Sequence, residues 1–135
     1  VLKEQKSSFK MFFTIGLLLL IFLGIFVVIK TADASVEGEL LKVKGIYGVS
    51  IPISEIREVK KLETLPSLGV RRVNGIGLGP IKIGYFRYNE LGSVKLCILK
   101  NEAPYILVIT DEQKILIGLG KEKNEELYNK LKDNL

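Results

Sequence analysis

The hydrophobic pattern of the chain is dominated by one apolar run near the N-terminus. Residues 11–29, which begin at Met11 and end at Ile29, carry no charge and are flanked by Lys10 and Lys30. Because a helix rises about 1.5 Å per residue, this run nearly crosses a hydrocarbon layer of about 30 Å. The pattern predicts a transmembrane helix that anchors the chain in a lipid bilayer, preceded by a basic tail over residues 1–10.

The rest of the chain consists of short apolar segments separated by turn residues. Residues 30–37 are mostly polar and predict a linker, and residues 38–135 are long enough for one small domain with one core. Strand-like segments fall at residues 39–44, 49–53, 54–63, 81–88, 94–99, 105–110 and 115–119. Segment 105–110 is almost entirely apolar, which indicates a strand buried on both faces. The glycine-rich residues 65–80 predict a loop.

The C-terminal segment has the pattern of an amphipathic helix. Asn124 is an acceptable N-cap, and two glutamates follow it directly. Leu127 and Leu131 lie four residues apart, and Leu135 continues the same line. This single apolar stripe predicts a helix that packs on the sheet with one side only.

Together these elements predict a mainly β chain with one N-terminal transmembrane helix. Short antiparallel strands in close succession, about seven in all and capped by a C-terminal helix, favour a barrel or sandwich. The sequence resembles the bacterial pleckstrin-homology-like domain family, many members of which carry N-terminal membrane spans. The matching residues lie at 53–59, 69–75, 84–86, 91–92, 105–110 and 124–127.

The resemblance implies a fold and a membrane context, but no catalytic residues and no settled ligand. Eukaryotic pleckstrin-homology domains bind phosphoinositides through a basic pattern in the first hairpin. That pattern is missing from the first hairpin here, so no phosphoinositide specificity is inferred.

Composition excludes several classes of function. Residues 38–135 contain 16 Lys or Arg and 12 Asp or Glu, which is too mild an excess for a nucleic-acid-binding stripe. The chain has no His, which removes the commonest general base and the usual zinc ligand. Cys97 is the single cysteine, so the chain has neither a disulfide framework nor a thiolate cluster. We therefore expect no catalytic residues, no metal site and no cofactor.

Two groups of residues are candidates for a binding surface. Lys60, Lys61, Arg71 and Arg72 are candidates for contact with a protein partner or lipid headgroups, although such charges usually form a solvated face. In an extended strand Arg71 and Arg72 point to opposite faces, so one at most serves a given surface. The aromatic residues Tyr85, Phe86 and Tyr88 are expected to serve mainly in core packing.

Two functions remain open at this point. One is a membrane-anchored, non-enzymatic binding or scaffolding module that contacts a protein partner, a second copy of itself or the membrane surface. The other is a secreted or periplasmic β domain released by cleavage after about Ala34, since Ala32-Asp33-Ala34 has the small-x-small form of a cleavage site. The lysines before residue 11 favour a cytoplasmic N-terminus and a domain outside the cytoplasm, whereas the lysines that follow residue 29 favour the opposite orientation. On balance we expect the domain to lie outside the cytoplasm.

Overall fold

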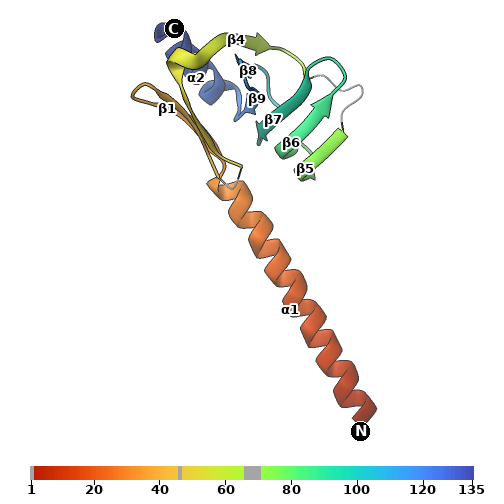
Figure 1. Cartoon of the computed structure of the whole chain (residues 1–135). Helices are drawn as coiled ribbons and strands as arrows, with labels where there is room; N and C mark the ends of the chain where they lie inside the picture. Colours follow the sequence, from red (N-terminus) through yellow and green to blue (C-terminus); the bar gives the residue numbers. More distant parts are fainter. Residues whose placement is uncertain (1, 46, 66–70) are drawn as a thin grey trace.

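The computed structural model describes residues 2–45, 47–65 and 71–135. Its N-terminal part is one long helix, α1 (Leu2–Thr31), which projects from a folded domain (Figure 1). The stretch Ser7–Thr31 is long and apolar enough to cross a membrane, and only 6% of its most apolar window is buried. The predicted apolar helix is therefore present and extends beyond residues 11–29 at both ends.

The prediction of a linker over residues 30–37 is wrong. The helix continues to Thr31, and strand β1 (Asp33–Glu37) begins after a single intervening residue. β1 pairs antiparallel with β2 (Leu40–Lys44), which pairs with β3 (Val49–Pro52) in a three-stranded sheet. Ala34 alternates with polar neighbours and is buried opposite Val43, so this short polar segment still has an apolar face.

A second sheet has six strands. After a short 3-10 helix, η1 (Ile53–Glu55), they are β4 (Ile56–Leu62), β5 (Arg71–Leu78), β6 (Ile81–Tyr88), β7 (Gly92–Ile98), β8 (Tyr105–Thr110) and β9 (Lys114–Gly118). Their order is β4-β8-β9-β7-β6-β5. The predicted antiparallel pattern holds for every pair in this sheet except β7 and β9, which run parallel.

Strand β5 corrects the prediction of a loop over residues 65–80, of which 66–70 lie outside the described residues. The glycines of this segment sit in a strand because they let two backbones approach closely. Gly75 lies directly opposite Gly84 of β6, and both have positive φ angles, of 146° and 126°. A Cβ on Gly84 would lie 2.6 Å from the Cα of Gly75, so neither position accepts a side chain without a shift of the backbone.

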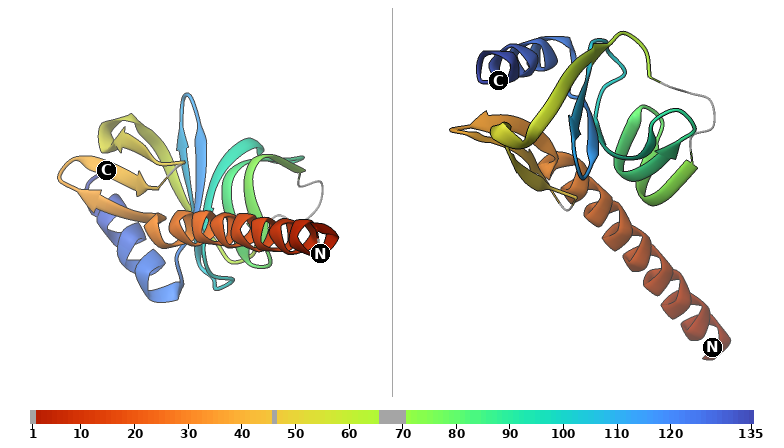
Figure 2. Two further views of the ribbon diagram at one scale, coloured as in Figure 1. Left: turned by 90° about the horizontal axis from the view of Figure 1, so that it is seen from below. Right: turned by 45° about the horizontal axis from the view of Figure 1, so that its top comes forward.

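The domain has two hydrophobic cores on opposite faces of the six-stranded sheet. Ile106 and Val108 of β8 belong to the first, whereas Tyr105 and Leu107 belong to the second. The prediction that residues 105–110 are buried on both faces is therefore confirmed. The first core also takes in side chains from the three-stranded sheet and from both helices. The three-stranded sheet and α2 lie on one side of β8 and β9 (Figure 2).

Helix α2 (Lys121–Asp133) ends the domain and packs through Leu127 and Leu131, as predicted. Leu135 lies beyond its end and is 55% exposed, so the predicted stripe stops at Leu131. The helix begins three residues before Asn124, and the N-cap residue is Gly120.

Nine strands in two sheets lie in the described residues, rather than about seven. The predicted class, a mainly β sandwich with an N-terminal apolar helix and a C-terminal helix, is confirmed.

Candidate binding surfaces

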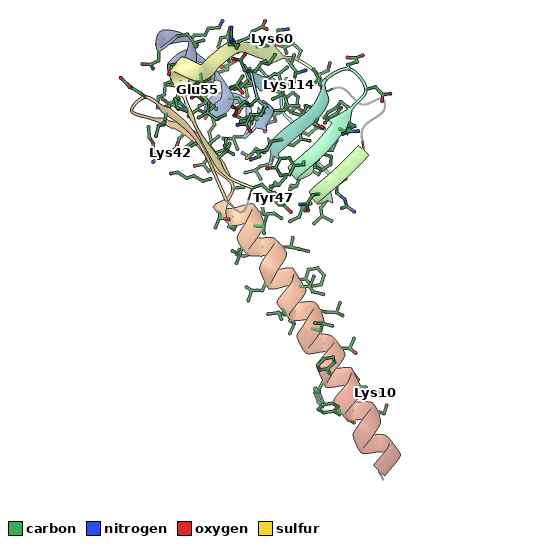
Figure 3. The ribbon with its side chains drawn as sticks, in the orientation of Figure 1. Lys10, Lys42, Tyr47, Glu55, Lys60 and Lys114 are labelled. Atoms are coloured by element: carbon green, nitrogen blue, oxygen red, sulfur yellow. The ribbon has the colours of Figure 1, made fainter. Side chains whose placement is uncertain are left out.

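Lys60 and Lys61 are neighbours in β4 and already have partners. The ammonium of Lys60 lies 3.5 Å from a carboxylate oxygen of Glu58. The ammonium of Lys61 lies 4.5 Å from the centre of the Tyr128 ring on α2, and that of Lys132 approaches the same ring. Lys60 lies on the side of the domain away from α1 (Figure 3). The two lysines are therefore placed on a surface remote from the point where α1 leaves the domain.

Arg71 and Arg72 occupy the first positions of β5, opposite Arg87 and Phe86 of β6. β4 and β5 are the two outermost strands of the six-stranded sheet. Lys60 and Lys61 are neighbours along the chain, and so are Arg71 and Arg72. The strand order places the two pairs at opposite edges of the sheet. A register shift between Arg72 and Asn74 adds a local irregularity to this edge.

A polar groove of about 470 Å³ lies between η1 and the β8–β9 turn. Arg57 crosses it with two contacts of 2.8 Å, from Nε and Nη2, to the two carboxylate oxygens of Asp111. The hydrogen bond and charge of this carboxylate raise the pKa of Arg57 above its usual value. Glu55 and Glu112 also line the groove. Because Arg57 is already paired, the groove offers mainly acidic and hydroxyl groups.

A cluster of aromatic and polar side chains lies where the two sheets meet near α1. The Tyr47 and Tyr85 rings meet edge to face with centroids 6.1 Å apart, and the Tyr47 hydroxyl donates to Asn74 Oδ1 at 3.3 Å. The Lys95 ammonium lies 5.0 Å from the centre of the Tyr85 ring. We call Tyr47, Asn74, Tyr85 and Lys95 the junction cluster. The sequence pattern did not single out Tyr47 or Lys95, although a lysine between the apolar residues Val94 and Leu96 indicates an unusual position in a strand.

Comparison with known proteins identifies the fold. Residues 32–135 match the family described as the bacterial PH domain. The chain belongs to this family. No curated protein and no solved structure is significantly similar to the chain. The match begins at Ala32, so β1 is part of the bacterial PH domain rather than a tether in front of it.

PH-like domains are in general binding modules rather than enzymes. The Cys97 thiol is buried, and burial raises its pKa to about 12, so it is not a thiolate near neutral pH. Burial also raises the pKa of Tyr88. Among the described residues, no three His, Cys, Asp or Glu side chains gather to hold a metal ion.

Phe86 and Tyr88 are buried in the second core of the PH domain, in agreement with their predicted role in packing. Tyr85 differs, because 43% of its surface is exposed. Among the three aromatic residues considered from the sequence, Tyr85 is therefore the one that a ligand could reach.

Proposed function

We propose that this chain is a membrane-anchored, non-enzymatic binding module whose PH domain is held against the bilayer surface by α1. The observation that carries the proposal is the junction between helix and domain. Side chains along most of α1 are exposed and apolar, as a lipid environment requires, whereas Val28 and Ala32 pack into the first core of the domain. A helix inserted in the bilayer would therefore position the domain firmly, with one fixed side towards the membrane.

The same junction weighs against release of the domain by a signal peptidase. Cleavage after about Ala34 would cut β1 in two, since that strand spans Asp33–Glu37. It would also remove Val28, Ala32 and Ala34 from the core. A released domain would lose part of its own packing, whereas an anchored chain keeps it.

We further propose that the domain faces the outside of the cytoplasm and meets a protein partner or a second copy with the surface turned away from α1. Lys60 and Lys61 are exposed residues of β4, and Lys60 lies on the side of the domain away from α1 (Figure 3). Arg72, at the other outer strand, is also exposed. Lys60 and Lys61 are therefore the candidate residues for this surface, and Arg71 with Arg72, at the opposite edge of the six-stranded sheet, is a separate candidate contact.

The anchoring proposal is tested by expressing the full chain, extracting membranes at alkaline pH and measuring the mass of the retained protein. We expect the full-length mass in the extracted membranes. A variant with Leu19→Lys and Phe22→Lys should move to the soluble or aggregated fraction, because two charges at the middle of the span oppose insertion. The matched control, Leu19→Ala with Phe22→Ala, should stay. A shortened wild-type product that begins near residue 35 would refute anchoring and support the released domain.

A further inference from the structure

The exposed apolar side chains of the domain are concentrated at its junction with α1. Within the described part of the domain, Leu78, Tyr85 and Leu135 are the large apolar residues that stay exposed, and Leu135 is the C-terminal residue. The other two lie on the β5–β6 hairpin. Leu78 is paired with Ile81, and Tyr85 lies four residues further along β6, so the strand period places both on one face of the hairpin.

This face is turned towards the end of α1. Tyr47, which contacts Tyr85, lies in the β2–β3 turn beside the end of the helix (Figure 3). Gly45 of the same turn packs on the helix end, because a Cβ built there would lie 3.4 Å from the Cα of Ala32. Both ribbon views place β5 and β6 beside the end of α1 from which the domain starts (Figures 1 and 2).

The distance of this face from the hydrocarbon layer can be estimated from the length of chain that follows the apolar run. The apolar run ends at Ile29, and Ala32 lies three residues, or about 4.5 Å, further along the axis. The polar headgroup layer adds about 5–7 Å to each side of the hydrocarbon. The β2–β3 turn and the junction cluster therefore start within the headgroup layer, where Tyr side chains are enriched in membrane proteins.

The junction cluster also contains Lys95, a lysine with a buried stem and, among the described residues, no counter-charge. Lys95 is 7% exposed, and among the described residues its ammonium has neither an ion pair nor a hydrogen bond. Its nearest interaction is with the ring of Tyr85, directly opposite in the β6–β7 pair. Ser35 Oγ and Tyr88 Oη are the fully enclosed polar side-chain atoms without a partner in this part of the chain. The Lys95 ammonium is not among them, so it reaches the surface while its alkyl stem is buried.

An ammonium that reaches the surface without a counter-charge is free to pair with an anion, and hydrogen bonds between ionised groups are among the strong ones. At this position the anion that the membrane supplies is a lipid phosphate, and the Tyr85 hydroxyl can donate a hydrogen bond to the same group. We propose that the junction cluster binds the phosphate of a membrane phospholipid and that Leu78 enters the headgroup layer beside it. This inference rests on the proposed function, because it needs α1 in the bilayer.

The absence of Trp from the chain permits a direct test of the position of Leu78. Full-length single-Trp variants are reconstituted in phosphatidylcholine–phosphatidylglycerol vesicles that contain a headgroup nitroxide quencher. Leu78→Trp should be quenched, whereas Tyr128→Trp on α2 should not. Phe22→Trp is measured in vesicles whose lipids are brominated on the acyl chain, and its quenching shows that α1 lies in the hydrocarbon layer. Quenching of Phe22→Trp without quenching of Leu78→Trp would overturn this inference and leave the anchor intact. A failure of Phe22→Trp to be quenched would overturn both.

The phosphate contact is tested with Lys95→Met, which keeps the length of the side chain and removes its charge. In dodecyl maltoside, which carries no phosphate, we expect the variant to melt at the same temperature as the wild type or higher. In phospholipid nanodiscs the wild type should melt higher by roughly 4–8 °C, the shift that one added favourable contact gives in a domain of this size. Equal melting temperatures of the two proteins in nanodiscs would refute the contact. A wild-type gain produced in detergent by inorganic phosphate alone would identify a free anion, rather than a lipid, as the ligand.

Discussion

At the scale of single residues, Asn124 shows how one buried amide joins three parts of the domain. Its side chain is fully buried: Oδ1 accepts from the Leu119 N–H at 3.1 Å, and Nδ2 donates to the carbonyls of Pro104 and Ile117 at 2.7 and 3.0 Å. The amide therefore ties α2 to β9 and to the segment before β8. A sequence pattern can mark Asn as a helix cap, but these partners lie up to 20 residues away.

We predict that Asn124→Ala lowers the free energy of unfolding by about 2–4 kcal/mol, because it removes three hydrogen bonds inside the protein. Asn134→Ala is the matched control, since Asn134 lies on the exposed end of the same helix and donates to a single carbonyl, that of Lys130, at 2.7 Å. Urea unfolding of the full chain in detergent measures both variants. Equal losses in the two would contradict the role given to Asn124.

Cys97 gives a second prediction at this scale, which concerns pH. Burial in the first core raises the pKa of the thiol to about 12, and the charge of Asp33 adds to the effect. The folded state thus keeps its proton at a pH where the unfolded chain, with a pKa near 9, has released it. The stability that the neutral thiol contributes is complete below pH 9 and is lost as the pH rises towards 12.

The wild-type chain should therefore lose up to about 1.4 kcal/mol more per pH unit above pH 9 than Cys97→Ala does. The comparison uses slopes rather than absolute stabilities, because the substitution also removes buried volume. Tyr88 and Tyr105, whose pKa values are raised as well, are present in both proteins and cancel in the difference. Parallel slopes from pH 8 to pH 10.5, measured by urea unfolding, would show that the thiol titrates alike in the two states.

At the scale of elements, local patterns predicted some strands and missed others for identifiable reasons. β2, β6, β7, β8 and β9 carry dense or alternating apolar residues, and each was predicted close to its observed bounds. β5 was missed because its glycines resemble a loop, whereas its pairing with β6 depends on the close approach of Gly75 and Gly84. β1 was missed because a five-residue polar segment carries little periodic signal. The parallel contact of β7 with β9 depends on long-range topology that turn lengths do not reveal.

The candidate surfaces were likewise only partly predictable from local sequence patterns. Lys60, Lys61, Arg71 and Arg72 could be identified as neighbours along the chain, but their placement on opposite outer strands depends on the order of the sheet. The junction cluster joins a turn, two strands of the hairpin and β7. Its members are separated by up to 48 positions, from Tyr47 to Lys95, so no local spacing could have grouped them.

A prediction for β1 distinguishes a strand from a tether. Replacing both Ser35 and Val36 by Pro removes two consecutive N–H groups, at least one of which must face β2. We expect a loss of about 3 kcal/mol or more in the free energy of unfolding, compared with about 1 kcal/mol for the double Ala control, which loses only part of the Val36 packing. A flexible linker would tolerate both changes equally, and that outcome in detergent unfolding would contradict the strand.

At the scale of the whole molecule, α1 and the domain act as one body because Val28 and Ala32 belong to the first core. In the proposed anchored chain, the direction in which α1 inserts therefore decides which side of the membrane the domain occupies. Lys3, Lys6 and Lys10 precede the apolar run, whereas Lys42 and Lys44 after it lie in β2, where both pair with Glu37 at 2.9 and 3.1 Å. Lysines that fold into the domain act less strongly on insertion than those of the tail, which favours a cytoplasmic N-terminus.

We predict that protease added to cells stripped of their wall digests a C-terminal tag on the wild-type chain. Substituting Gln for Lys3, Lys6 and Lys10 should lower the digested fraction, because the tail then no longer outweighs Lys30. The matched control, Gln at Lys42 and Lys44, should leave that fraction unchanged or raise it. Protection of the wild-type tag until lysis would place the domain in the cytoplasm. The headgroups beside the junction cluster would then be those of the anionic inner leaflet, and Lys95 would meet a more negative surface than on the outer side.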